Sequence, residues 1–186
     1  MRIKGESIIV LPEMIEKKFG ADGLRKWLDA LASEARTVFE NKISPYDWFD
    51  LDRIYLDPVE KICELFYNGN HQGAFDAGWF DADQALGGIY RIFIRLGSVH
   101  FIMRRASVLF SSYYEGGAME VAESGKNRGV LRITEFDGPM RKINEQTISG
   151  YICRAIELTG YSKVKVEIGQ AISKGDKYTD FIFTWE

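Results

Sequence analysis

The feature that most constrains this chain is a change in the spacing of its apolar residues at Gly116-Gly117. Before that point they recur every three or four positions, as in helices that bury one face. After it they alternate with polar residues, as in strands that bury one side. Helical and strand segments that are segregated along one chain are typical of an α+β architecture. The length of 186 residues fits one domain over 1–186, with a helical part of about 1–116 and a sheet-rich part of about 117–186.

The strongest helical pattern lies in the middle of the chain. Apolar residues over 86–94 have the spacing of a core-facing helix, and Gly97-Ser98 separates them from a second such helix over 99–113. Two long helices with so short a connection are expected to pack antiparallel. Other helices are predicted over 8–19, 22–31, 35–39, 58–67 and 148–156, and a loop is predicted over 41–56.

Four segments of the last third have the alternation of strands. They cover 119–121, 130–136, 164–168 and 181–185, and turn residues such as Gly125 and Gly175 lie between them. The helix over 148–156 falls between the second and third of these strands. The sequence therefore predicts an N-terminal helical layer packed on a C-terminal antiparallel sheet of about four strands with one crossover helix.

Charge and apolar content exclude several classes of protein. Lys and Arg number 24 against 27 Asp and Glu, so the chain lacks the basic excess of a nucleic-acid binder. No apolar run approaches the roughly 18 residues that would cross a membrane. The N-terminus has no apolar stretch of a secretion signal, and Cys63 and Cys153 lie far apart, so a cytoplasmic protein with reduced thiols is expected.

Familiar catalytic and metal-binding motifs are missing from the sequence. His71 and His100 have no partner at zinc-ligand spacing, and there is no nucleophile elbow, phosphate loop or dinucleotide fingerprint. His100, near the start of a helix, is expected to be a hydrogen-bonded group and not a haem ligand. We therefore predict no catalytic residue, no metal site and no cofactor, haem included.

One segment, from Asp47 to Asp83, is unusually acidic. It holds nine acidic residues against two basic ones, Arg53 and Lys61. A cation site or a docking face for a basic partner is one interpretation. Helix caps and solvated helix faces are the interpretation that we prefer.

Several motifs, spread over nearly the whole chain, resemble an uncharacterised bacterial family related to the vinyl-reductase-type ligand-sensing domains. They are Lys4-Gly5, Trp48-Phe49, the segment 88–98, 103–106, 113–117, Gly150-Tyr151, 157–160, Gly175-Asp176 and 183–185. This superfamily is similar in fold to haem-nitric-oxide sensor domains and to a vesicle-tethering subunit with an acyl-binding pocket. The resemblance implies a helical layer over an antiparallel sheet that encloses an apolar pocket, often in a dimer.

The chain departs from these relatives at two sites. Where metal-binding members of the sensor group have cysteines, this chain has Glu145 or its neighbours and Asp180, so the zinc site is not carried over. Neither His71 nor His100 lies in a motif that matches the haem sensors.

The function that this combination predicts is non-enzymatic sensing. We expect a small apolar or aromatic molecule to bind between the central helices and the sheet, and the domain to signal through a partner protein or a homodimer interface. An interaction or scaffold protein without a ligand is the alternative. An enzyme for a bulky ring such as a tetrapyrrole is the third, and it would need His100 to meet Asp81 or Asp83. The residues expected to line the pocket are Trp79, Tyr90, Phe93, Phe101, Met103 and Phe110.

Overall fold

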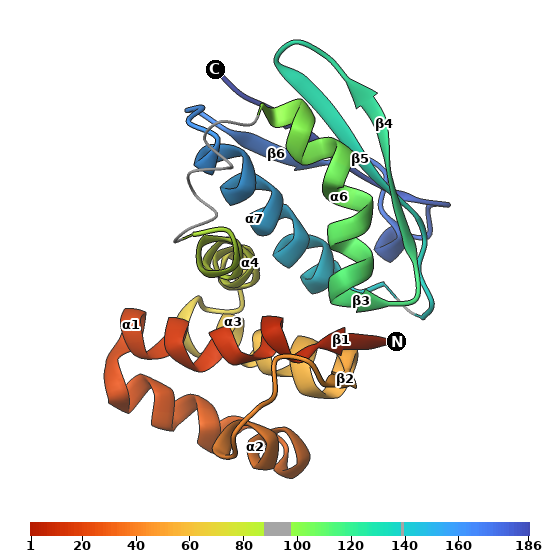
Figure 1. Cartoon of the computed structure of the whole chain (residues 1–186). Helices are drawn as coiled ribbons and strands as arrows, with labels where there is room; N and C mark the ends of the chain where they lie inside the picture. Colours follow the sequence, from red (N-terminus) through yellow and green to blue (C-terminus); the bar gives the residue numbers. More distant parts are fainter. Residues whose placement is uncertain (88–97, 139) are drawn as a thin grey trace.

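The change in apolar spacing is realised as an α+β fold, as predicted. A computed structural model describes residues 1–87, 98–138 and 140–186 (Figure 1). The elements of the N-terminal half are β1 (Arg2–Lys4), α1 (Gly5–Ala30), α2 (Ser33–Glu40), β2 (Trp48–Asp50), a π-helical turn (Asp52–Leu56), α3 (Asp57–Phe66) and α4 (Gln72–Ala85). Those of the C-terminal half are α6 (Val99–Tyr113), β3 (Tyr114–Glu115), β4 (Ala118–Ser124), β5 (Arg128–Glu135), α7 (Lys142–Leu158), β6 (Lys165–Ile168), a 3-10 turn (Ile172–Lys174) and β7 (Thr179–Thr184).

The main sheet has four antiparallel strands in the order β4-β5-β7-β6, which confirms the prediction of about four. Leu131 on β5 pairs with Phe181 on β7, and Phe181 pairs with Ile168 on β6. Phe181 and Phe183 point into the core because alternate residues of a strand share a face. Figure 1 shows α6 and α7 on the same face of this sheet, with α7 as the crossover between β5 and β6.

Helices α4 and α7 cross at backbone contact. A Cβ atom on Gly78 would lie 1.8 Å from the carbonyl oxygen of Thr147, and one on Gly150 would lie 1.9 Å from that of Phe75. Only glycine leaves room for this approach. The crossing fixes α4 against α7 and so sets where the side chains of α4 lie relative to α6 and the sheet.

The start and end of several helices agree with the sequence. Gly20 interrupts α1 with a φ of 73°, so the predicted stop after Phe19 is confirmed. Helix α6 has the predicted bounds, and the Ser98 side chain caps it by accepting a hydrogen bond from the backbone N–H of Phe101 at 3.3 Å. The predicted helix over 86–94 falls mostly on 88–97 and lies outside the described residues.

Three short strands and one helix were not predicted. Strand β1 lies between β2 and β3 in a second antiparallel sheet, with Ile3 buried at its centre. The segment 41–56, predicted to be a loop, contains β2 and the π-helical turn, so that prediction is wrong in part. Helix α4 escaped prediction because its apolar positions are mainly Ala and Gly, which give little amphipathic contrast.

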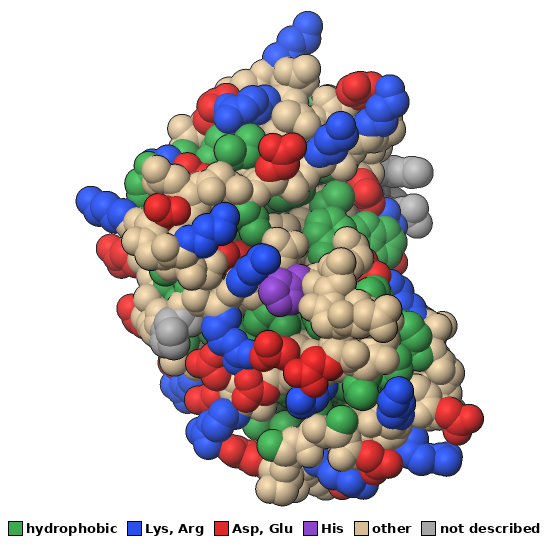
Figure 2. All heavy atoms as spheres, turned by 180° about the vertical axis from the view of Figure 1, so that it is seen from behind, with side chains coloured by type: hydrophobic (Ala, Val, Ile, Leu, Met, Phe, Trp, Pro, Cys, Tyr) green, Lys and Arg blue, Asp and Glu red, His purple; other side chains and the backbone are tan. Residues whose placement is uncertain are grey.

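Most carboxylates of the acidic segment 47–83 form ion pairs. Arg141 contacts Asp52, Asp57 and Glu60, and Lys18 lies 2.5 Å from Asp76. Figure 2 shows acidic and basic side chains intermingled over the helical half of the molecule as seen from behind. This arrangement agrees with solvated, paired helix faces. Of the helices that the structure describes, none is both long and apolar enough to cross a membrane.

Candidate functional site

A cavity of about 90 Å³ lies between helix α6, helix α7 and the main sheet. One face of α6 forms a wall of it, because Ile102, Ala106, Leu109 and Tyr113 are three or four residues apart. Two more residues of α6 and residues from eight other elements complete the lining, and nearly all of them are apolar or aromatic. They are Ser7, Tyr55, Gly78, Asp81, Met103, Phe110, Tyr114, Met119, Leu131, Thr147, Ile148, Tyr151, Ile152, Ala155, Ile156 and Phe183.

The structure places the six sequence-predicted pocket residues in different surroundings. Met103 and Phe110 line the cavity. Phe101 does not, because its ring is 36% exposed and carries the guanidinium of Arg105 at 4.7 Å from its centroid. Trp79 also lies off the cavity, in a polar network described below. Tyr90 and Phe93 lie outside the described residues, and contact of any of the six with a ligand stays a prediction.

Asp81 is the residue of this site that sequence reasoning undervalued. It lies on α4 with 4% of its surface exposed, lines the cavity, and its Oδ1 atom has no hydrogen-bond partner among the described residues. Burial raises the pKa of Asp81 to about 7, although the hydroxyl of Ser7 acts to lower it. The local sequence does not single Asp81 out, because Asp76 and Asp83 lie on the same helix.

Four phenols surround this carboxyl group. Burial raises the pKa of Tyr55, Tyr113, Tyr114 and Tyr151 well above the usual value, and the negative charge of Asp81 raises each further. The Tyr151 hydroxyl lies 3.4 Å from that of Tyr113. The site therefore combines neutral phenols with one buried acid that ionises near neutral pH.

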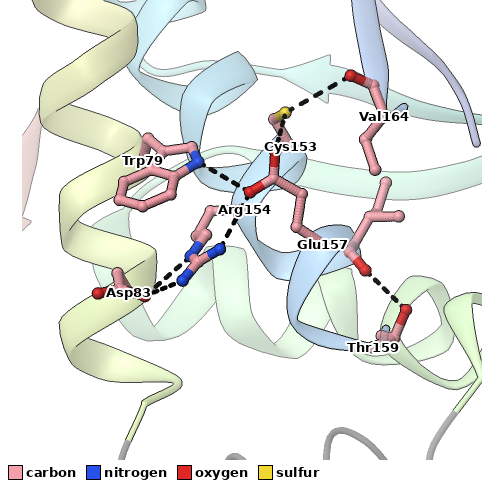
Figure 3. A network of polar contacts seen from close by, with 8 residues as sticks. Trp79, Asp83, Cys153, Arg154, Glu157, Thr159 and Val164 are labelled. Atoms are coloured by element: carbon pink, nitrogen blue, oxygen red, sulfur yellow. Dashed lines mark hydrogen bonds and ion pairs between the residues drawn. The ribbon is translucent and has the colours of Figure 1, made fainter. Parts of the chain in front are cut away.

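A polar network joins α4 to α7 outside the cavity (Figure 3). The guanidinium of Arg154 donates to Asp83 at 2.8 Å and to Glu157 at 3.1 Å, and it stacks on the ring of Trp79 at 4.2 Å from the centroid. The indole N–H of Trp79 donates to Glu157 at 3.0 Å. Figure 3 shows these side chains turned toward one another across the two helices. Trp79 is thus a contact between helices in this structure.

Neither histidine lines the cavity. Nε2 of His100 lies 2.9 Å from the carbonyl oxygen of Gly125, and its ring meets the edge of Trp185. His71 is the residue that precedes α4. The enzyme hypothesis required His100 to meet Asp81 or Asp83, but His100 contacts Gly125, Asp83 pairs with Arg154, and Oδ1 of Asp81 has no partner among the described residues.

The fold is shared with solved structures of H-NOX proteins, the haem nitric-oxide sensor fold. An H-NOX protein from S. oneidensis in the Fe(II)NO state matches with a TM-score of 0.75 and 14% identity, over 99% of each chain. The unliganded Fe(II) H-NOX protein from K. algicida matches with a TM-score of 0.72 and 11% identity, over 99% of this chain and 97% of that one. The sequence matches no protein-family model and no curated protein.

These matches correct two expectations. The relationship to vinyl-reductase-type domains finds no support, whereas the likeness to haem-nitric-oxide sensors does. The expectation that haem is out of place here is contradicted, because the neighbours of this fold are Fe(II) proteins and one is described through its haem redox potential and porphyrin distortion. The chain has the fold of haem proteins.

The described cavity wall nevertheless does not fit a haem. Its volume of about 90 Å³ is well below the roughly 300 Å³ at which small-molecule pockets begin. Neither imidazole lines it, and the other lining groups known to hold haem iron are phenols and thioethers, such as Met103 and Met119. The described cavity therefore differs from a haem pocket in its size and in its lining.

The positions where related sensors hold zinc have other partners in this chain. Glu145 is buried and accepts hydrogen bonds from Ser173 and Thr179, and Asp180 pairs with Arg132 at 2.7 Å. Among the residues that the structure describes, no cluster of His, Cys, Asp and Glu has the arrangement of a metal site.

Proposed function

We propose that this chain is a sensory domain that binds its ligand in the cavity beneath α6. The observation that carries the proposal is the cavity itself, a mainly apolar space where elements far apart in the sequence converge. Well-packed cores contain few voids larger than a water molecule. This space is larger than a water-sized void and can hold a few heavy atoms, which makes it a candidate site for a very small ligand.

The size and lining favour a small, mainly apolar ligand. A volume of about 90 Å³ accommodates only a few heavy atoms, since a cavity of about 150 Å³ is known to hold benzene. Haem is the second candidate, and the shared fold favours it. Haem in this chain would need a wider space than the described cavity.

Helix α6 is the element that we propose to carry the signal. Its inner face touches the cavity, and its outer face exposes Val108, at 71%, together with Phe101. A ligand that fills the cavity contacts Ile102 and Leu109 and thereby shifts α6 together with its outer face. A partner protein, or a second copy of the chain, would bind there and read the change.

The test compares the wild-type chain with one variant that fills the cavity. Ala106 lines the cavity, and its neighbour Ser107 is exposed on the same helix. We expect native mass spectrometry of the purified full-length chain, together with haem absorption after incubation with ferric haem and desalting, to reveal a bound ligand. Ala106→Phe should abolish the binding, and Ser107→Phe should preserve it.

The outcomes of this test distinguish the two ligand candidates and show whether the cavity is the binding site. A retained small molecule supports the first ligand candidate. A haem absorption band that the wild type shows and Ala106→Phe loses supports haem as the ligand of the same cavity. If the wild-type chain retains nothing in either measurement, or if Ala106→Phe binds the ligand as well as the wild type does, the proposed site is wrong.

A further inference from the structure

The Oδ1 atom of Asp81, which has no hydrogen-bond partner among the described residues, makes this cavity chemically specific. Asp81 is buried, its Oδ1 atom faces no hydrogen-bond donor within the described residues, and it lines the cavity. A buried polar atom that lacks a partner costs about 1–3 kcal/mol, and more if it is charged. Natural cores rarely retain such an atom unless a bound group satisfies it.

Among the residues that the structure describes, no basic side chain lines the cavity beside Asp81. The described lining contains no Lys, Arg or His, and Thr147 and Ser7 are its only polar side chains apart from Asp81 and the four tyrosines. The nearest other charged group that acts on Asp81 is Glu6, which has the same sign. Within the described lining, Asp81 is therefore an acidic group without a basic group to balance it.

We propose that the ligand of this cavity carries a protonated amine, or a similar cationic N–H donor, on a short apolar tail, and that Asp81 binds the cation. This inference rests on the proposed function, because it names the ligand class of the same cavity. The ammonium donates to Oδ1 of Asp81, in a charge-assisted hydrogen bond. The neutral phenols of Tyr113 and Tyr151 supply electron-rich rings and hydroxyl oxygens nearby, which suit a cation. The apolar tail lies among Leu109, Ile152 and their neighbours.

An ordered water is the competing partner for Oδ1. A cavity of about 90 Å³ has room for water, and water is the commonest partner of a buried acid. The two alternatives differ in charge: water binds the protonated and ionised acid alike, whereas an ammonium stabilises only the ionised acid. The amine therefore binds more tightly as Asp81 ionises.

Calorimetric titration of the full-length chain with three small probes of one shape tests the proposal. The probes are isobutylamine, isobutanol and isobutyrate, which carry a cation, a neutral hydroxyl and an anion on the same tail. At pH 7.5 we expect the amine to bind about tenfold or more tightly than the alcohol, and the acid anion not to bind. Asp81→Asn should remove the preference for the amine and leave the alcohol within a few-fold of its wild-type affinity.

A control variant and the pH dependence separate this role from a structural one. Asp83→Asn changes a carboxylate of the same helix that pairs with Arg154, and it should leave the amine affinity unchanged. Amine affinity should rise between pH 5 and pH 8 as Asp81 ionises, because the phenols of Tyr55, Tyr113, Tyr114 and Tyr151 stay neutral there. Glu6 is the remaining acid beside Asp81, and Glu6→Gln should keep the rise.

The failure of this inference is distinguishable from that of the proposed function. If isobutanol binds in a manner that Ala106→Phe abolishes, but isobutylamine binds no better, the amine proposal is wrong and the cavity remains a binding site. If Asp81 is satisfied by water only, Asp81→Asn will not change the ranking of the three probes, which also overturns the proposal. If no probe binds and no ligand is retained by the purified chain, both proposals fail.

Discussion

Helix α7 packs against α4 on one side and against α6 on another, and the two contacts differ in how closely the helices approach. Against α4 it lies in contact along most of its length, whereas it approaches α6 at only a few positions. The difference follows from side-chain size. Gly78 and Gly150 let the backbones of α4 and α7 touch, and bulky residues such as Phe110 and Tyr151 hold α6 and α7 apart.

Helix α7 thus both holds α4 in place and forms a wall of the cavity. Because the α4 contact is closely packed, it places Asp81 at the edge of the cavity. Because the α6 contact is spanned by large side chains that do not fill it, a space remains. The polar network around Arg154 adds a second fastening between α4 and α7, outside the cavity. If this account is right, enlarging a residue should have opposite effects on the two sides of α7.

The largest expected effect is that of Gly150→Ala. The added Cβ would lie 1.9 Å from the carbonyl oxygen of Phe75, so the backbones of α4 and α7 must separate. Overpacking against rigid backbone costs about 3 kcal/mol of unfolding free energy or more. Urea denaturation followed by circular dichroism measures the change.

Gly169→Ala is the matched control for that substitution. There the new Cβ meets the flexible tip of Ile182 at 3.0 Å, so the unfolding free energy should change by about 1 kcal/mol at most. Equal losses for the two variants would contradict the close α4–α7 crossing.

Asp81, which the α4–α7 crossing holds at the cavity, should make the unfolding free energy depend on pH. The pKa of Asp81 is about 7 in the folded chain, above its ordinary value of 3.8, so the folded state binds this proton more tightly than the unfolded state. Stability from this group is therefore complete below about pH 4 and declines as the pH rises to about 7. Asp81→Asn should remove that decline and raise the unfolding free energy at pH 8 by up to about 4 kcal/mol.

Unfolding free energies of wild type and variant across pH 4 to 8 test this. Asp83→Asn serves as the control, because that carboxylate is paired with Arg154 and does not line the cavity. An unchanged slope in Asp81→Asn would show that another group, or a partner of Asp81, governs the pH dependence.

The sequence predicts helix α6 and strand β7 better than it predicts helix α4. The apolar spacing of α6 and the apolar–polar alternation of β7 are clear sequence patterns, because each element buries one face and exposes the other. Met103 and Phe110, both predicted to line a ligand pocket, lie on the cavity wall, and their contact with a ligand stays a prediction. Helix α4 was missed because Gly78 and its small neighbours are selected for close approach to α7 and carry no amphipathic pattern.

The candidate site is harder to predict because it depends on contacts across the chain. Trp79 has the size and polarity of a pocket residue, yet its indole N–H bonds to Glu157, a partner 78 positions away. Phe101 is apolar but lies on the outer side of α6, one position before Ile102, which lines the cavity. Asp81 was read as one of many solvated acids of the segment 47–83, because nothing in its local sequence reveals burial.

A third, smaller effect is expected from Arg154→Met. The variant keeps most of the apolar stem over Trp79 and removes the bonds to Asp83 and Glu157, which are partly exposed. Ion pairs of this kind contribute about 1 kcal/mol, so the unfolding free energy should fall by about that amount in low salt and by less in high salt. Arg128→Met, at the exposed pair with Glu123, is the control and should cost less. A salt-independent loss would mean that packing on Trp79, and not charge, fastens the helices.

The smallest expected effect has the opposite sign to the first. Ala106 lines the cavity on α6, so Ala106→Leu extends a side chain into existing space without meeting backbone. Filling a cavity in this way stabilises a protein by about 0.5–2 kcal/mol, and we expect the lower end, because part of the space must remain around Asp81. Thermal unfolding of the full-length chain measures the gain, with Ser107→Leu as the control, since that exposed position should change little. A loss for Ala106→Leu as large as that for Gly150→Ala would show that α6 packs against α7 as closely as α4 does, and the cavity on which the binding proposals rest would then not exist in solution.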